Sequence, residues 1–207
     1  MTNTLKLIAF GIAYAFAQPT FAAVIFSDNF DTEPAGLNST PSQWTVTNGT
    51  VDTIGSGFID FLPGNGNYID LDGSTGNAGN MTSIALTLSP GVNYTLLFDL
   101  AGSQRGDSNT VRAGLDFDAD SFFDVFVDIT LPSTAPFAQF SLPFTVASLT
   151  SNSHIVFDHS GGDNLGLLLD RVVLNTKTSG GVVPEPASLA LLGIGLAGLG
   201  AMFRRKA

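Results

Sequence analysis

The sequence contains no cysteine, only two histidines and few basic residues. Without cysteine the chain has no disulfide framework and no thiolate to act as a nucleophile or metal ligand. Eight Lys and Arg stand against 18 Asp and Glu, so the formal net charge is −10. Phosphate groups are bound through Lys and Arg, and the sequence therefore argues against nucleic acid and anionic lipid as partners.

The basic residues are distributed unevenly along the chain. Lys6 lies near the N-terminus and three more occupy 204–206, which leaves four basic against 17 acidic residues between Ala23 and Val183. Sixteen of the 18 acidic residues are aspartates. Such a surface permits binding of divalent cations, and it also serves solubility without any ligand.

Histidine and carboxylate residues give little support to an enzyme. Asp158-His159-Ser160 contains the residue types of a catalytic triad, but neighbours in sequence do not form one. A glycoside hydrolase needs two carboxyl groups that face each other across a cleft, and the sequence singles out no such pair among its aspartates. We therefore predict that the protein is not an enzyme.

The first 22 residues have the three regions of a secretory signal peptide. Lys6 precedes an apolar stretch from Leu7 to Ala17, and small residues around Thr20–Ala22 provide a cleavage site. The apolar run is too short to be a stable membrane anchor. We predict export with cleavage after Ala22, or alternatively after Ala17, in preference to a buried N-terminal helix.

Residues 23–176 consist of short strand-like segments separated by turns. Apolar residues alternate with polar or small ones, as at Tyr94, Leu96 and Phe98, and turn residues recur roughly every 8–12 residues. No part of this region sustains the 3.6-residue period of a helix. The pattern predicts an all-β domain, an antiparallel β-sandwich, whose core is filled mainly by phenylalanines, 13 of the chain's 17 lying in this region.

Four aromatic side chains are candidates for contacts with sugar rings. Trp44, Tyr68, Tyr94 and His159 would stack on or bond to a sugar if they were exposed beside Asp and Asn. Trp44 lies in a strand-like run, however, and packing in the core is the simpler interpretation for it. The sequence leaves the carbohydrate-binding residues, if there are any, unknown.

The C-terminal region begins with a short polar linker at 177–182 and ends with an apolar segment. Residues 187–203 carry no charge and would form a helix of about 25 Å, which is marginal for a hydrocarbon core of about 30 Å. The cations at 204–206 would hold its end on the cytoplasmic side. The segment is therefore predicted to enter the inner membrane as a single transmembrane helix.

The last 25 residues, 183–207, resemble the PEP-CTERM sorting signal. The resemblance rests on the three parts of that signal in order, with the apolar helix in the middle: Val183, Pro184, Glu185 and Pro186 before the helix, and Arg204, Arg205 and Lys206 after it. It implies a Gram-negative-type bacterium with an exosortase, a membrane transpeptidase that recognises Pro-Glu-Pro and cuts near it. It also implies export linked with extracellular polysaccharide. The alternative is a permanent single-pass anchor.

Two stretches of the predicted sandwich resemble galactose-binding-like jelly-roll modules. They are Asp28–Glu33, followed by Trp44–Val46, and the segment Gly161–Leu174, which reads GGDNLGLLLDRVVL. The resemblance implies a structural Ca²⁺ that links the first strand with the last. Carried over to this chain, its ligands would be Asp31 and Asp170.

Asp28 and Glu33 are weaker candidates for the same calcium ion. The residues themselves also support Asp170, because an unpaired carboxylate within the apolar run LLLDRVVL would be costly to bury. The alternatives for Asp170 are a salt bridge with Arg171 or Arg112, or a position that faces solvent.

A second acidic stretch, Asp116–Asp124, has aspartates at positions 1, 3, 5 and 9 of an EF-hand-like loop. Position 6 is Ser121 in place of the glycine that makes the turn, and position 12 is Val127 in place of the bidentate glutamate. We therefore predict the tip of a hairpin with solvated acids rather than a calcium loop.

Together these features predict an exported protein, sorted by its C-terminus to the cell surface or extracellular matrix. Its expected role is non-catalytic, structural or adhesive, with extracellular polysaccharide as the candidate ligand and an exosortase-type transpeptidase as a transient partner. A permanently anchored lectin-like protein is the first alternative. A polysaccharide hydrolase is the less favoured one.

Overall fold

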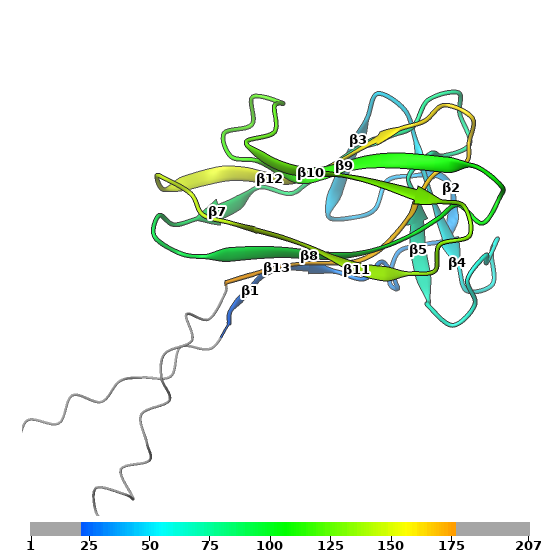
Figure 1. Cartoon of the computed structure of the whole chain (residues 1–207), viewed down its shortest axis with the longest axis horizontal. Helices are drawn as coiled ribbons and strands as arrows, with labels where there is room; N and C mark the ends of the chain where they lie inside the picture. Colours follow the sequence, from blue (N-terminus) through cyan, green and yellow to red (C-terminus); the bar gives the residue numbers. More distant parts are fainter. Residues whose placement is uncertain (1–21, 177–207) are drawn as a thin grey trace, which may run out of the picture. The chain divides into compact units, whose positions relative to one another are not determined.

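The computed structural model describes residues 22–176, which form two antiparallel sheets packed face to face (Figure 1). Sheet A contains β1 (Val24–Asp28), β2 (Gly36–Ser39), β4 (Val51–Gly55), β5 (Asn67–Asp70), β8 (Tyr94–Ala101), β11 (Ala138–Phe144) and β13 (Leu168–Thr176). Sheet B contains β3 (Trp44–Thr47), β6 (Asn80–Ser83), β7 (Leu86–Leu88), β9 (Ser108–Asp116), β10 (Val125–Pro132) and β12 (Thr150–Ser160). The predicted all-β antiparallel sandwich is confirmed.

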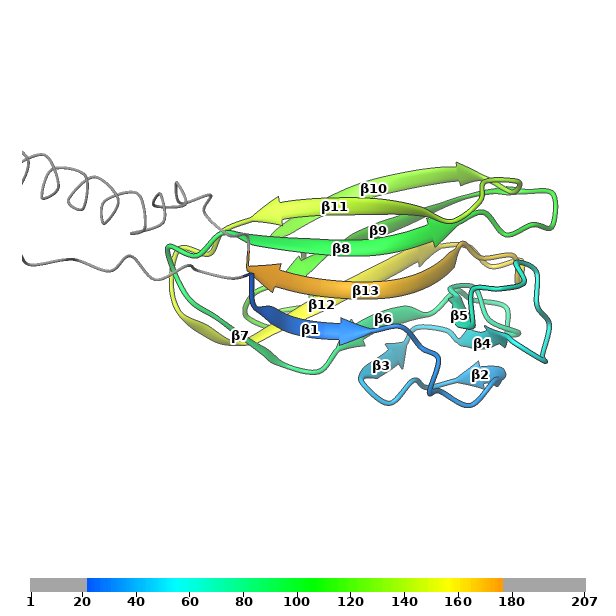
Figure 2. The same cartoon turned by 90° about the horizontal axis from the view of Figure 1, so that it is seen from below.

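The order of strands differs from their order along the chain. Sheet A runs β11-β8-β13-β5-β4-β2, with β1 also paired to β13, and sheet B runs β10-β9-β12-β6-β3, with β7 also paired to β12. The first and last strands therefore meet, and Thr176 N–H donates to Ala23 O over 2.9 Å where β1 begins beside the end of β13 (Figure 2).

The described part of the chain, 22–176, includes no helix long and apolar enough to cross a membrane. The predicted signal peptide, the linker 177–182 and the sorting signal with its helix 187–203 lie outside the described residues.

The core between the sheets is built from the inward-facing residues of each alternating strand, with aromatic rings at its centre. Phe98 and Phe157, one from each sheet, pack edge to face with their ring centroids 5.3 Å apart. Trp44 packs edge to face on Phe26 at 5.4 Å and donates its Nε1–H to Asp28. These contacts explain the period-two pattern, since each inward side chain contributes a large apolar area.

One end of the sandwich is held together by buried polar side chains that anchor the loop 161–167. Asp72 accepts the N–H groups of Gly162 and Asp163, Asp70 accepts that of Gly166, and His159 Nε2 accepts that of Leu167. Because Nε2 is the acceptor, the neutral ring carries its proton on Nδ1. Burial lowers the pKa of His159, which favours this neutral form.

Arg105 is the cation of this buried network. Its guanidinium lies 2.5 Å from Asp70, donates to Asn164 O over 2.7 Å and covers the Phe61 ring at 5.0 Å. Burial raises the pKa of Asp70 to about 7, an increase that the charge of Arg105 opposes. The guanidinium therefore keeps a buried carboxylate and a loop carbonyl from being left unpaired.

We expect Arg105→Ala to lower the free energy of unfolding by about 3 kcal/mol, because the buried Asp70 carboxylate would lose its cationic partner. Arg171→Ala is the matched control, since its bridge to Asp99 is on the surface, with the Arg171 side chain 52% exposed, and should cost less than about 1 kcal/mol. Urea unfolding of the compact unit Ala22–Lys177 measures both. Equal losses would contradict the role given to Arg105.

Candidate functional site

The outer face of sheet B carries a groove of about 530 Å³. Its floor comes from β3, β6, β9 and β12, and its rim from the loop that joins β9 to β10 and from the start of β10. A second hollow of about 250 Å³ shares Arg112 and Asp158 with the groove and adds Thr110, Asp128 and Ser160. The two hollows adjoin, so the depression extends along the strands.

The backbone register aligns five side chains in a row across the floor of this depression. Each is the cross-strand partner of the next, from β10 through β9, β12 and β6 to β3: Asp128, Arg112, Asp158, Asn80 and Thr47. A second row lies two residues further along β9, where Gly114 has Phe126 of β10 and Val156 of β12 as its cross-strand partners. Because outward side chains alternate along each strand, the sheet presents a polar row next to an apolar one.

Arg112 is fixed by two contacts at the centre of the polar row. Its Nε and one terminal nitrogen donate to the two oxygens of Asp128 over 2.7 and 2.8 Å, and its guanidinium covers the Phe126 ring at 4.1 Å. The hydrogen bonds raise the pKa of Arg112 and lower the pKa of Asp128. The planar guanidinium is therefore held flat by a bidentate pair and an aromatic face.

Gly114 makes room for the aromatic side of the groove. A Cβ atom at this position would clash first with the backbone oxygen of Val125, and it would lie 2.8 Å from both Cδ1 of Phe123 and Cα of Phe126. Phe123 and Phe126 pack edge to face with centroids 5.9 Å apart, and Phe122 beside them is 74% exposed. An aromatic ring this exposed on a groove rim offers an unoccupied apolar face.

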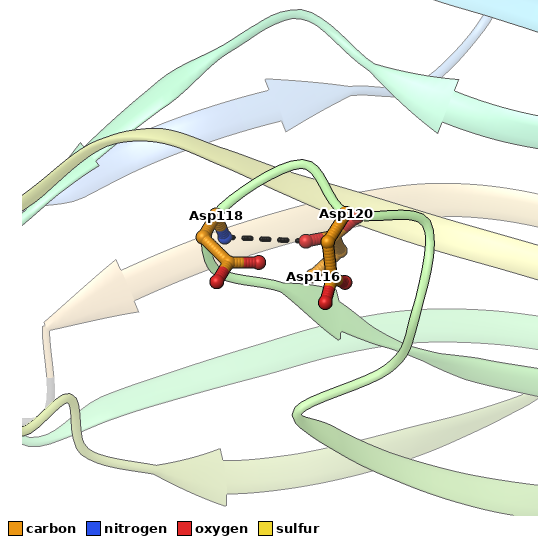
Figure 3. Close-up of side chains that lie close together, drawn as sticks. All are labelled: Asp116, Asp118 and Asp120. Atoms are coloured by element: carbon orange, nitrogen blue, oxygen red, sulfur yellow. Dashed lines mark hydrogen bonds between the residues drawn. The ribbon is translucent and has the colours of Figure 1, made fainter.

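The loop 117–124, which gives Ala119, Ser121, Phe122 and Phe123 to the rim of the groove, is organised by Asp116 (Figure 3). The Asp116 carboxylate accepts N–H groups from Asp118, Ala119 and Ser121 over 2.7–3.2 Å. Asp116 is buried, whereas Asp118 and Asp120 are exposed. The stretch is thus a hairpin tip between β9 and β10, as predicted, but its first aspartate is part of the loop structure and is not solvated.

Among residues 22–176, Asp116, Asp118 and Asp120 are the group whose potential metal-ligand atoms all lie within 4.8 Å of one another. The four residues predicted to hold calcium do not gather in this way. Asp28 is buried and accepts from Phe30 N–H and Trp44 Nε1–H, while Glu33 accepts from Ser42. These two carboxylates support the local loop.

Asp31 and Asp170 come from the first loop and the last strand. Burial raises the pKa of Asp170 to about 6, and the charges of Asp31 and Asp99 add to this rise. Neither of the arginines considered for Asp170 pairs with it, because Arg112 pairs with Asp128 and Arg171 with Asp99. Asp170 therefore forms no salt bridge with either of these arginines.

The aromatic residues considered for sugar contacts are not available to a ligand. Trp44, Tyr68, Tyr94 and His159 are at most 5% exposed, so the core interpretation of Trp44 is correct and a sugar-stacking role for the four is excluded. Sequence reasoning missed Phe122 and Phe126. The one signal in the sequence is their position, because Phe122 lies within the acidic stretch Asp116–Asp124 and Phe126 lies just after it.

Comparison with known proteins identifies the C-terminal segment. Residues 182–206 match the PEP-CTERM protein-sorting motif. This confirms the predicted sorting signal and indicates an exported protein that is anchored or processed at its C-terminus. No curated protein matches the sequence.

Solved structures that resemble the sandwich come from several kinds of protein. The CBM22-1 xylan-binding domain of Paenibacillus barcinonensis Xyn10C is 11% identical with a TM-score of 0.51, and the match covers 77% of this chain and 97% of that one. The K3 cleaved adhesin domain of Lys-gingipain from Porphyromonas gingivalis is 15% identical (TM-score 0.52, 75% and 100% covered). A cyclase from Fischerella sp. is 14% identical (TM-score 0.55, 78% and 100% covered). At these identities the matches establish the jelly-roll fold alone.

Proposed function

We propose that the protein is an exported, non-catalytic carbohydrate-binding protein of the cell surface or extracellular matrix, and that the groove on sheet B binds the glycan. The observation that carries the proposal is the exposed Phe122 ring beside the polar row that contains Arg112 and Asp158. Sugar rings have apolar faces and polar edges, and they match a site with both kinds of surface. Among proteins of this fold, one is described as a xylan-binding domain and another as an adhesin domain.

The chemistry of the groove supports binding in preference to catalysis. Glycoside hydrolysis requires two available carboxyl groups. The groove is lined by Asp116 and Asp158, and Asp116 already accepts three N–H groups of its own loop. Asp158 is then the one lining carboxylate, within the described residues, that is left for a ligand.

We propose that sorting proceeds through an exosortase-type transpeptidase that recognises Pro184-Glu185-Pro186 and cuts near it. The match of residues 182–206 to the sorting motif supports this step. In this scheme segment 187–203 is in the inner membrane only until the cut, and the sandwich is then released to the surface or matrix. A permanently anchored lectin-like protein is the alternative.

We also propose that Asp31 and Asp170 hold a structural Ca²⁺. Carboxylate oxygens are the ligands that Ca²⁺ prefers, and the ion would neutralise two like charges that otherwise repel. Asp31 accepts hydrogen bonds from Asn67 N–H at 3.0 Å and from the Asn29 amide at 2.6 Å, so its position is fixed. A bridging ion would tie the first loop to the last strand.

For the groove, we expect Phe122→Ala to weaken binding to an insoluble glycan at least about tenfold, as loss of an aromatic anchor does. The melting temperature should not change, because the ring is exposed. Leu37→Ala on sheet A, 49% exposed, is the control. Pull-down with xylan, cellulose and chitin measures the effect, and equal binding by both variants would refute the assignment.

For calcium, we expect the ion to raise the melting temperature of Ala22–Lys177 and EDTA to reverse the rise. Because the folded pKa of Asp170 is about 6, the apo protein loses stability as the pH rises from about 4 to about 6. Asp170→Asn should remove the response to calcium and the part of this loss that comes from Asp170, while the part from Asp70, whose pKa is about 7, remains. Asp118→Asn is the control, and a response lost in that variant instead would place the ion in the acidic loop.

For sorting, we expect mature protein isolated from an exosortase-carrying bacterium to lack residues 187–203. Glu185→Ala should leave the full C-terminus in place, because the acid between the two prolines is lost, whereas Lys177→Ala should not. Intact-mass spectrometry distinguishes the forms. An uncut C-terminus in the unmodified protein would favour the permanent anchor.

A further inference from the structure

The cations of the sandwich are already paired. Residues 22–176 contain three arginines and 17 acidic residues. Arg105 lies 2.5 Å from Asp70, Arg112 lies 2.7 Å from Asp128, and the Arg171 guanidinium lies 2.7 Å from Asp99. The described part of the chain therefore offers no uncommitted guanidinium to a uronate, sulfate or phosphate group.

The groove itself is rich in hydrogen-bond acceptors. Asp158 is exposed in the polar row, and no described residue donates a hydrogen bond to its carboxylate or forms a salt bridge with it. His154 also lines the groove, and its Nδ1 lies 2.7 Å from Ser83 O, so the neutral ring carries its proton there and leaves Nε2 as an acceptor. A ligand that suits this lining brings donors.

We propose that the groove binds a glycan with free amino groups, a polymer of partly or fully deacetylated hexosamine, and that Asp158 pairs with a sugar ammonium. The proposal rests on carbohydrate binding at this groove and specifies its ligand. An ammonium group supplies donors and a positive charge to Asp158, whereas the guanidinium of Arg112 in the same lining is already joined to Asp128. The hexose ring would lie against Phe122, which shares the groove with Asp158.

The electrostatic field of the domain acts in the same direction. The excess of acidic over basic residues attracts a polycation and repels a polyanion at distances up to about a Debye length, roughly 8 Å at physiological ionic strength. Binding of an amino-sugar polymer should therefore weaken with salt. An N-acetylated polymer of the same backbone keeps the ring faces but loses the charge, so it isolates the contribution of the ammonium.

The test is calorimetry of the full-length chain with three oligosaccharides: a glucosamine hexamer, the N-acetylglucosamine hexamer and an oligogalacturonate. The buffer keeps the amines protonated, and each titration is repeated at low and physiological ionic strength. We expect the glucosamine hexamer to bind about tenfold more tightly than its N-acetylated counterpart, and the oligogalacturonate not to bind. Asp158→Asn should abolish the difference, because it lowers the affinity for the glucosamine hexamer more than the affinity for the N-acetylated hexamer.

Asp163→Asn is the matched control, because it removes one exposed charge outside the groove. If both variants lose the same affinity, the attraction is general and the role of Asp158 is refuted. If both hexamers bind equally to all variants, the amino-sugar preference is wrong while carbohydrate binding stands. If no oligosaccharide binds and Phe122→Ala has no effect on polysaccharide pull-down, both the amino-sugar preference and carbohydrate binding at the groove are refuted.

Discussion

The groove depends on how Arg112 is held on the outer face of sheet B. The guanidinium is joined to both oxygens of Asp128 and lies over the Phe126 ring, so it has one orientation. It covers one face of Phe126, which leaves Phe122 as the exposed aromatic surface of the rim. Its hydrogen bonds go to Asp128, so Asp158 in the same row forms no salt bridge within the described residues.

The other two arginines of the described domain are also paired with aspartates. Arg105 pairs with the buried carboxylate of Asp70, and its hydrogen bond to Asn164 O helps to fix the loop 161–167. Arg171 pairs with Asp99 on the surface. Most aspartates have no cationic partner, and several instead accept backbone N–H groups, as Asp72 and Asp116 do. An aspartate-rich sequence thus serves to order loops as well as to charge the surface.

The fold was predictable because alternation of polar and apolar residues is a local property that each strand displays by itself. The sorting signal was predictable because its three parts are contiguous in sequence. The groove was not, since the row from Asp128 to Thr47 is set by the register of five strands, and apart from the hairpin β9–β10 these strands are far apart in the chain. Sequence cannot tell an aromatic residue that packs in the core from one that lies on a rim until the sheet is assembled, and Trp44 and Phe122 show both outcomes.

The most direct measurement is a crystal structure of the protein with a bound glucosamine oligosaccharide. The account predicts a sugar ring against Phe122, with its ammonium nitrogen within hydrogen-bond distance of the Asp158 carboxylate and with Arg112 unmoved. An oligosaccharide bound on another face of the sandwich, with the groove on sheet B vacant, would contradict it.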